Sequence, residues 1–336
     1  MAYQREQHMA KTLMIQGVAS GVGKSIVVAA LCRILKQDGL RVSPFKAQNM
    51  TLNTVRIESS LEIAHAQFVQ ARAAGVEPSV EMNPVLIKPG GDMSSEILLM
   101  GRPVGTFHAR DYKERSPVLF RSIAKALDDL RSRFDAVIIE GAGSPVELNL
   151  MEHEIVNMRV ARYTGAPTLI VGDISKGGVF ASLLGTIVLL PQTDRELVKG
   201  FIINKFRGDS ESLKPGLERL EEMTGKKVLG VVPWLDGFGI PDEDVVSGSA
   251  VADKKRLTDP AISAEKIGLS DTTAGTEERC LSDQIPSVKK RSPADPMVNT
   301  VEVSESSLDR LAHVVRSSID MGRIYDLLYA GGPGMQ

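Results

Sequence analysis

Short apolar runs alternate with stretches of helical periodicity along most of the chain, and this alternation limits the fold more than any other feature. The runs AVIIE at 136–140 and GFIIN at 200–204 stay apolar up to their last residue, which is typical of strands that helices cover on both faces. The pattern predicts an α/β fold with a doubly wound, mostly parallel sheet. Strands are expected at 12–16, 42–46, 136–139, 168–172, 201–204 and 228–232. Helices are expected at 25–37, 63–74, 117–133, 155–163, 179–190 and 213–223.

A glycine-rich run, GVASGVGKS at 17–25, joins the first expected strand to the first expected helix. A phosphate-binding loop (P-loop) needs this context, because its main-chain N–H groups and the helix N-terminus face the phosphates of a bound nucleotide. Five residues separate Gly17 from Gly23, one more than the standard spacing, and a glycine-rich turn without a ligand is the less favoured alternative. Lys24 is predicted to reach the β- and γ-phosphates of ATP, and Ser25 to ligate Mg²⁺. The candidate nucleotide-binding residues here are Gly17, Ser20, Gly21, Val22, Gly23, Lys24 and Ser25.

A carboxylate ends the third expected strand, where Glu140 precedes the run Gly-Ala-Gly at 141–143. The carboxyl ends of parallel strands meet at one edge of a sheet, so Glu140 is expected beside the P-loop as a second Mg²⁺ ligand. A strand-end glutamate facing solvent is the alternative. The small residues that follow favour the functional interpretation, because glycine lets the backbone approach a ligand closely.

Composition excludes several other classes of protein. The chain carries 40 Lys and Arg against 42 Asp and Glu, and only 4% of its residues are aromatic, so a nucleic-acid-binding surface is not expected. Two cysteines in 336 residues exclude a disulfide scaffold and a four-cysteine zinc site. No apolar stretch reaches the length of a membrane span and the N-terminus is polar, which predicts a cytoplasmic protein without a membrane partner.

The chain changes character near Ser247. The core domain is expected at 9–247, and the polar segment 248–303 is expected to be a low-complexity, disordered linker. A single amphipathic C-terminal helix is predicted within 304–330, at 306–328, because apolar residues recur there at helical spacing. These residues are Leu308, Leu311, Ala312, Val315 and Ile319.

Ordered stretches over nearly all of 12–247 resemble the cobyric acid synthase family, which belongs with the dethiobiotin-synthetase-like P-loop proteins. They include IQGVASGVGKS at 15–25, PFKAQNMTLNT at 44–54, IIEGAGSPVELNL at 138–150, VGDISKGGVFASLLGT at 171–186 and INKFRGD at 203–209. The resemblance implies an ATP- and Mg²⁺-dependent enzyme of cobalamin biosynthesis. Such an enzyme amidates peripheral carboxylates of adenosylcobyrinic acid a,c-diamide through acyl phosphates. It implies a corrinoid substrate and an ammonia source as partners, and it leaves a homodimer open.

The resemblance also implies roles for individual residues. Lys24, Lys46 and Glu140 would be catalytic, although Lys46 could equally be a surface lysine at a strand end. Glu62 would be a further metal ligand at the start of a helix, with stabilisation of the helix dipole as its alternative. Nucleotide-base contacts would come from Asn204, Lys205 and Arg207. The substrate candidates, some of which could instead be loop caps, are Gln48, Asn49, Asn53, Ser144, Asp173, Gly177 and Gly178.

Departures from the family pattern leave other functions open. Ala64-His65, Glu154 and Ser175-Lys176 stand near the expected corrinoid cleft, where the family usually has other residues. The resemblance implies a C-terminal glutaminase domain with a cysteine nucleophile in a glycine-rich turn. We expect this domain to be missing here, because Cys280 lies in the polar segment EERCLSDQ. We therefore expect ammonia to come from solution or from a separate glutaminase. The alternatives are a catalytically decayed nucleotide-binding remnant and another amide-forming enzyme of the dethiobiotin-synthetase type.

Overall fold

The computed structural model describes residues 9–90, 94–108, 111–235 and 303–329. All of them belong to one compact unit, made of residues 1–246 and 301–336. The expected linker at 248–303 lies outside the described residues, apart from Val303, and so does Cys280.

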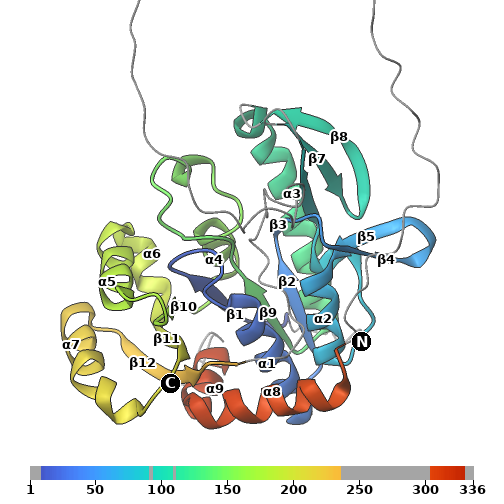
Figure 1. Cartoon of the computed structure of the whole chain (residues 1–336). Helices are drawn as coiled ribbons and strands as arrows, with labels where there is room; N and C mark the ends of the chain where they lie inside the picture. Colours follow the sequence, from blue (N-terminus) through green and yellow to red (C-terminus); the bar gives the residue numbers. More distant parts are fainter. Residues whose placement is uncertain (1–8, 91–93, 109–110, 236–302, 330–336) are drawn as a thin grey trace, which may run out of the picture. The chain divides into compact units, whose positions relative to one another are not determined.

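The centre of this unit is a six-stranded sheet in the order β12-β11-β10-β1-β9-β2, with every neighbouring pair parallel. Its strands match all six strand predictions. β1 lies between strands from the two halves of the chain, so the sheet is doubly wound, and the predicted fold class is confirmed (Figure 1). The bounds are β1 Lys11–Gly17, β2 Val42–Lys46, β9 Ala136–Glu140, β10 Thr168–Asp173, β11 Val198–Phe206 and β12 Lys227–Pro233.

Successive residues of these strands point into two different hydrophobic cores. Leu13 and Ile15 of β1 belong to one core, whereas Met14 belongs to the other. The same alternation places Ile138 and Ile139 of β9 in opposite cores. Because side chains alternate along a strand, a strand buried on both faces must be apolar throughout.

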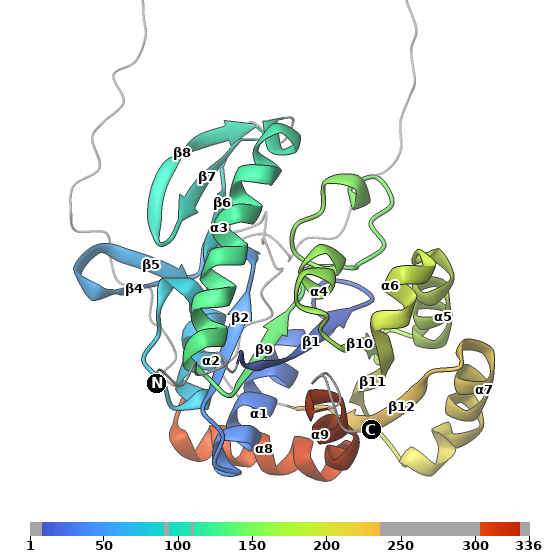
Figure 2. The same ribbon diagram turned by 180° about the vertical axis from the view of Figure 1, so that it is seen from behind.

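Helices cover both faces of the sheet (Figures 1 and 2). Side chains of α1, α8 and α9 pack into one core, and those of α3, α4, α5 and α7 into the other. α2 contributes Val69, Ala73 and Ala74 to the first core and Ala71 to the second. The bounds are α1 Lys24–Gln37, α2 His65–Ala74, α3 Tyr112–Arg133, α4 Met158–Thr164, α5 Val179–Leu189, α6 Gln192–Leu197, α7 Lys214–Thr224, α8 Glu305–Ser318 and α9 Met321–Tyr329. Short 3₁₀ turns lie at Glu58–Ser60, Val80–Met82, Met151–His153 and Ser210–Leu213.

A second sheet and a hairpin fill the long interval between β2 and α3, where the sequence predicts only one helix. The sheet has the order β3-β6-β7-β8 and is antiparallel except between β3 and β6. The hairpin joins β4 to β5. The helix expected at 63–74 therefore begins later, at His65, because β5 occupies the residues before it. The bounds are β3 Gln48–Met50, β4 Thr54–Ile57, β5 Leu61–Ala64, β6 Val85–Pro89, β7 Ser94–Leu99 and β8 Arg102–His108.

The C-terminal segment is part of the same unit as the sheet. The prediction of one helix at 306–328 is wrong, because α8 ends at Ser318 and Ile319 is extended, forming an antiparallel bridge with Gly230 of β12. The Asp320 N–H also donates to the carbonyl of Leu229 at 2.7 Å. A Cβ atom on Gly230 would lie 2.1 Å from the Ser318 carbonyl oxygen, so only glycine leaves room for this approach.

Ion pairs attach α8 to the helix that follows the P-loop. Arg33 of α1 is buried, and its guanidinium contacts the carboxylates of Asp309 and Glu305 at 2.7 Å each. Arg316 and Tyr325 both contact the carboxylate of Asp38 just beyond α1. The C-terminal helices are therefore docked directly on the P-loop helix.

Candidate active site

The glycine-rich loop has the backbone conformation that its glycines predict. Gly21 and Gly23 adopt φ values of 69° and 94°, in the left-handed region that favours glycine. A Cβ atom on Gly23 would lie 2.1 Å from Nδ2 of Asn204. The loop is therefore a closely packed turn, with Ser20 exposed at its tip.

Asn204 and Lys205, near the end of β11, bind main-chain carbonyls of this loop. The Asn204 amide donates to the Val22 carbonyl at 2.9 Å, and the Lys205 ammonium donates to the Gly21 carbonyl at 2.5 Å. Lys205 itself has a φ of 60°, which is uncommon for a residue with a side chain. Both residues were expected to contact a nucleotide base, and the structure places them against the loop.

Arg207 lies two residues after Lys205 and is exposed. Its guanidinium stacks at 4.0 Å over the ring of Trp234, which follows β12. Cation–π contacts of this kind hold a planar side chain in a defined orientation. Trp234 carried no predicted role, because a single tryptophan after an apolar strand gives no signal of a site.

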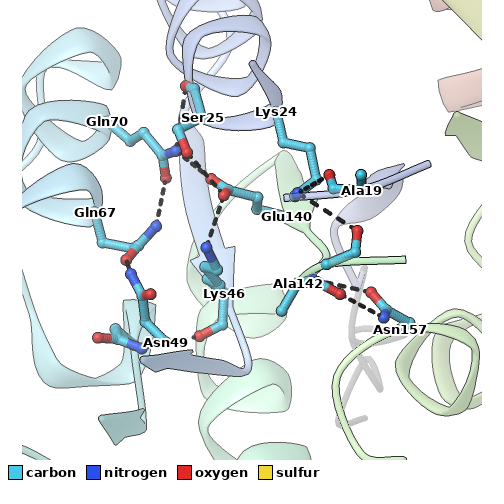
Figure 3. Close-up of polar contacts among 12 residues, drawn as sticks. Ala19, Lys24, Ser25, Lys46, Asn49, Gln67, Gln70, Glu140, Ala142 and Asn157 are labelled. Carbon is cyan, nitrogen blue, oxygen red and sulfur yellow. Dashed lines mark hydrogen bonds and ion pairs between the residues drawn. The ribbon is translucent and has the colours of Figure 1, made fainter. Parts of the chain in front are cut away.

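Lys24, the first residue of α1, is buried within the loop. Its ammonium donates to the Ala19 carbonyl at 3.1 Å and to the Gly143 carbonyl at 3.5 Å (Figure 3). Gly143 belongs to the Gly-Ala-Gly run after β9, so Lys24 bridges the two glycine-rich loops. The structure thus brings together the two motifs that the sequence singled out.

Glu140, at the end of β9, is completely buried and is the centre of the polar cluster in Figure 3. The Ser25 hydroxyl donates to its Oε1 at 2.9 Å, and the Lys46 ammonium donates to the same oxygen at 2.9 Å. The pairing of β2 with β9 puts Lys46 directly opposite Glu140. Lys46 is therefore a buried partner of Glu140, and the alternative of a surface lysine is wrong.

Two glutamines of α2, neither of them predicted from the sequence, complete this cluster. Gln70 donates to Glu140 Oε2 at 2.6 Å, and Gln67 donates to Gln70 Oε1 at 3.3 Å. Asn49 of β3 donates to Gln67 Oε1 at 2.8 Å. The available signal was a pair of uncharged polar residues, three positions apart, in the alanine-rich helix AQFVQARAA.

The loop after β9 is fixed by Asn157. Its side chain accepts a hydrogen bond from the Ala142 N–H at 2.9 Å and donates to the Ala142 carbonyl at 2.7 Å (Figure 3). It also donates to the carbonyl of Ser144 at 3.2 Å. Gly141 needs to be glycine here, because a Cβ atom would lie 2.4 Å from Asn157 Oδ1. Ser144 is buried in this loop, close to the P-loop side of the sheet.

Asp173 ends β10 and caps the turn that follows it. It accepts hydrogen bonds from the Ser175 N–H and hydroxyl at 2.8 and 2.6 Å, and Lys205 lies 3.4 Å from its other oxygen. Burial alone would raise the pKa of Asp173, but these bonds and the charge of Lys205 outweigh burial and lower it. Gly177 and Gly178 follow in left-handed conformations, and Gly178 is the residue before α5.

The prediction that Glu62 lies at the start of a helix is wrong, because Glu62 is in β5. Its carboxylate contacts the Lys88 ammonium at 2.5 Å and accepts from the Thr54 hydroxyl at 3.0 Å. Burial would raise the pKa of Glu62, but the bond and charge of Lys88, followed by the bond from Thr54, lower it. The charge of Glu62 is thus balanced by that of Lys88.

Two further substrate candidates, Gln48 and Asn53, lie in β3 and shortly after it, and Glu154 is one of the departures from the family pattern. Gln48 accepts a hydrogen bond from the Tyr112 hydroxyl at 2.8 Å, and Asn53 meets His65 through its backbone carbonyl at 3.0 Å. Glu154 accepts hydrogen bonds from main-chain N–H groups around the start of α4, including that of Arg159 at 3.1 Å. Glu154 therefore stabilises the start of α4, a role that side-chain oxygens of several residue types can fill.

The donor set at Ser25 and Glu140 fits Mg²⁺. Both groups offer oxygen ligands, and they already lie at hydrogen-bonding distance on a helix start and a strand end. Mg²⁺ is usually held by one or two carboxylates together with the phosphates of its nucleotide. Among the described residues there is no cluster of three or more His, Cys, Asp or Glu that could hold a metal without a nucleotide.

Comparisons with known proteins agree with this geometry. The model of the family described as "CobQ/CobB/MinD/ParA nucleotide binding domain" matches residues 13–244. The chain is 54% identical over 238 residues to a cobyric acid synthase of Dehalococcoides mccartyi, covering 71% of this chain and 47% of that protein. It is 50% identical over 283 residues to a cobyric acid synthase of a Thermoanaerobacter species, covering 84% of this chain and 55% of that protein.

The chain thus spans about half the length of the curated relatives it matches. Among solved structures, the signal recognition particle receptor FtsY of Elizabethkingia anophelis, in complex with GDP, aligns with a TM-score of 0.41 and 17% identity. That alignment covers 69% of this chain and 58% of the other, and so weak a likeness does not bear on function. In the described ranges, every helix is too short or too polar to cross a membrane. The resemblance to cobyric acid synthases is confirmed, and the chain belongs to the CobQ/CobB/MinD/ParA family of nucleotide-binding domains.

Proposed function

We propose that this chain is the ATP-dependent amidating part of a cobyric acid synthase. Its substrate would be adenosylcobyrinic acid a,c-diamide, and its products the corrinoid amides. The observation that carries the proposal is the contact between Ser25 and Glu140, next to Lys24 in an intact phosphate-binding loop. The curated relatives named cobyric acid synthase support the proposal by their name.

The reaction joins two half-steps. A corrinoid carboxylate oxygen attacks the γ-phosphorus of ATP, the bond to the ADP oxygen breaks, and an acyl phosphate forms. Ammonia then attacks the acyl carbon, the bond to the phosphate oxygen breaks, and an amide, inorganic phosphate and a proton are released. The first half-step brings two anions together, so positive charge must be concentrated where they meet.

The residues of the chain are suited to this task. Lys24 carries a positive charge into the loop that would hold the triphosphate, and Lys46 brings a second charge to the carboxyl edge of the sheet. Ser25 and Glu140 would hold Mg²⁺, which when bound screens the phosphate charges. Asn204 and Lys205 fix the loop by bonding its carbonyls, so its N–H groups keep their orientation.

The source of ammonia is a separate part of the proposal. The described part contains one cysteine, Cys32, which is wholly buried, and burial raises the pKa of its thiol. A buried, protonated thiol is a poor nucleophile. We infer that Cys32 is a core residue and that ammonia reaches the site from solution or from a glutaminase.

Mass spectrometry of the corrinoid tests the proposal. The purified chain is incubated with ATP, Mg²⁺ and the a,c-diamide, with ammonium chloride in one reaction and glutamine in another. We expect amidation with ammonium chloride and none with glutamine. Lys24→Ala should abolish the product, whereas Lys125→Ala, which removes an exposed lysine of α3, should leave it unchanged.

Other outcomes point to different functions. ATP binding without any corrinoid product would contradict the proposal and favour a nucleotide-binding remnant. Product formed from glutamine by the chain alone would contradict a separate ammonia source.

A further inference from the structure

Three buried amide side chains form a continuous line from β3 to the candidate metal ligand Glu140 (Figure 3). Asn49 donates to Gln67, Gln67 donates to Gln70, and Gln70 donates to Glu140, at 2.8, 3.3 and 2.6 Å. All three amides are at most 1% exposed. We call Asn49, Gln67 and Gln70 the amide relay.

The direction of the relay follows from the carboxylate at its end. Glu140 already accepts bonds from Ser25 and Lys46, and an ionised carboxylate can only accept. Gln70 must therefore turn its NH₂ group toward Glu140, which leaves its carbonyl facing Gln67. The same reasoning applies to Gln67, so the charge of Glu140 favours the observed direction of all three bonds.

Gln70 contacts both halves of the candidate metal site. Its Nε2 donates to Glu140 Oε2 at 2.6 Å and also to the main-chain carbonyl of Ser25 at 3.3 Å. Oε1 of Glu140 is left for the Ser25 hydroxyl and Lys46. One side chain of α2 thereby fixes the carboxylate of β9 relative to the first turn of α1.

The other end of the relay lies among the substrate candidates. Asn49 is in β3, between Gln48 and the segment leading to Asn53. Amides do not titrate near neutral pH, so the relay adds no charge next to the buried pair of Lys46 and Glu140. A line of bonds that each depend on their neighbour is able to transmit a change of orientation along its length.

We propose that Gln70 is a positioning residue for the Mg²⁺ site, and that the amide relay makes the geometry of this site depend on β3. This inference rests on the proposed function only in taking Ser25 and Glu140 as Mg²⁺ ligands. It assigns Gln67 and Gln70 a role in binding of the Mg²⁺–nucleotide complex, not in contact with the corrinoid.

The first test replaces Gln70 with methionine, which has a similar length but no amide. The affinity for a non-hydrolysable ATP analogue is measured by calorimetry with Mg²⁺ and with EDTA. Loss of a side chain that orients a metal ligand typically lowers metal affinity about 10- to 100-fold. We expect Gln70→Met to weaken binding about tenfold in Mg²⁺ and less than about twofold in EDTA. Equal weakening in both would overturn the positioning role.

Gln16→Met is the matched control, since Gln16 is a fully buried amide at the end of β1 that is outside the relay. It should change the two affinities by the same factor. Urea unfolding of each variant without nucleotide records any loss of stability. Gln67→Met, one hydrogen bond further from Glu140, should also weaken binding of the ATP analogue selectively in Mg²⁺, but by a smaller factor. This variant replaces Gln70→Met in the test if Gln70→Met does not fold.

The second test reverses the relay from its far end. Asn49→Asp has the shape of asparagine but, when ionised, cannot donate, so Gln67 would have to turn its NH₂ group toward residue 49. Gln70 would then turn as well and present its carbonyl to Glu140. We expect Asn49→Asp to weaken Mg²⁺-dependent binding at least about fivefold more than Asn49→Leu, which removes the donor without imposing an acceptor. Equal effects of the two substitutions would overturn the coupling to β3.

These measurements need no corrinoid. If the chain bound the Mg²⁺–nucleotide complex but amidated no corrinoid, the proposed function would fail and the relay could still be tested. If amidation occurred but Gln70→Met had no selective effect in Mg²⁺, the relay would fail and the proposed function would stand.

Discussion

Lys46 Nζ lies 2.9 Å from Glu140 Oε1, and their side chains are only 2% and 0% exposed. A buried ion pair is costly to break from one side, because the remaining charge then lacks its partner in a region without water. The stability of the protein therefore depends on Lys46 and Glu140, which are also proposed to be catalytic.

Replacing one member of this pair should destabilise the protein. We expect Lys46→Met to lower the free energy of unfolding by about 3 kcal/mol, since Glu140 would be left charged and buried. Urea denaturation followed by circular dichroism measures this. The double variant Lys46→Met with Glu140→Gln should recover more than half of the loss, and strictly additive losses would contradict the pairing.

Lys24 should matter for binding of the nucleotide. Its ammonium donates to main-chain carbonyls of the two glycine-rich loops, at 3.1 and 3.5 Å. Bonds between a charged donor and phosphate contribute about 1.5–3 kcal/mol, so Lys24→Ala should weaken ATP binding roughly tenfold to a hundredfold. Calorimetry with Lys125→Ala as the control checks this, and unchanged ATP affinity in Lys24→Ala would contradict the P-loop assignment.

Gly230 should be required for docking of the C-terminal helices. A methyl group there would meet the Ser318 carbonyl, and overpacking of this kind costs about 1–3 kcal/mol. Gly230→Ala should therefore lower the free energy of unfolding by that amount and expose α8 to limited proteolysis. Gly185→Ala is the control, because a Cβ atom there meets nothing within 4 Å. Equal behaviour of the two variants would show that α8 does not depend on Gly230.

The attachment of α8 should weaken in acid. The hydrogen bond from Arg33 lowers the pKa of Asp309 below its usual value of 3.8. A carboxyl group with a lowered pKa in the folded state stabilises the protein above its unfolded pKa, and this contribution is lost as the pH falls through the folded pKa. The difference in unfolding free energy between the wild type and Asp309→Asn should thus be constant from about pH 5 to 7, and should decrease as the pH falls below 3.8 and through the lowered pKa. A difference that does not decrease in acid would contradict the role of this ion pair.

The sequence predicted the central sheet well because each of its strands is buried on both faces. Runs such as the one around Ile138 can hardly form anything else. The second sheet escaped prediction because β8 is mostly exposed and contains Pro103 and Gly105, so its pattern resembles a loop. The break between α8 and α9 escaped because Ile319 keeps the helical spacing of apolar residues while its backbone pairs with Gly230.

Some residues of the candidate site could likewise be predicted from the sequence, and others could not. Ser25 and Glu140 could be predicted because a glycine-rich loop and a strand-end carboxylate have fixed places in a parallel sheet. Gln67 and Gln70 could not, because a buried glutamine and an exposed one look the same in a sequence. Glu62 was misplaced because it lies just before a helix in the sequence. In the structure it is in β5, paired in the hairpin with Arg56 of β4, and its carboxylate contacts Lys88 of β6.

The bridge between Ile319 and Gly230 has a consequence for behaviour in solution. β12 is the last strand on its side of the six-stranded sheet, and such an edge offers unpaired main-chain groups to any other extended chain. The extended residues between α8 and α9 occupy part of that edge with the chain's own backbone. The C-terminal segment thereby prevents other chains from pairing with this part of the edge. Removing the segment would therefore favour aggregation, even in a protein that still binds nucleotide.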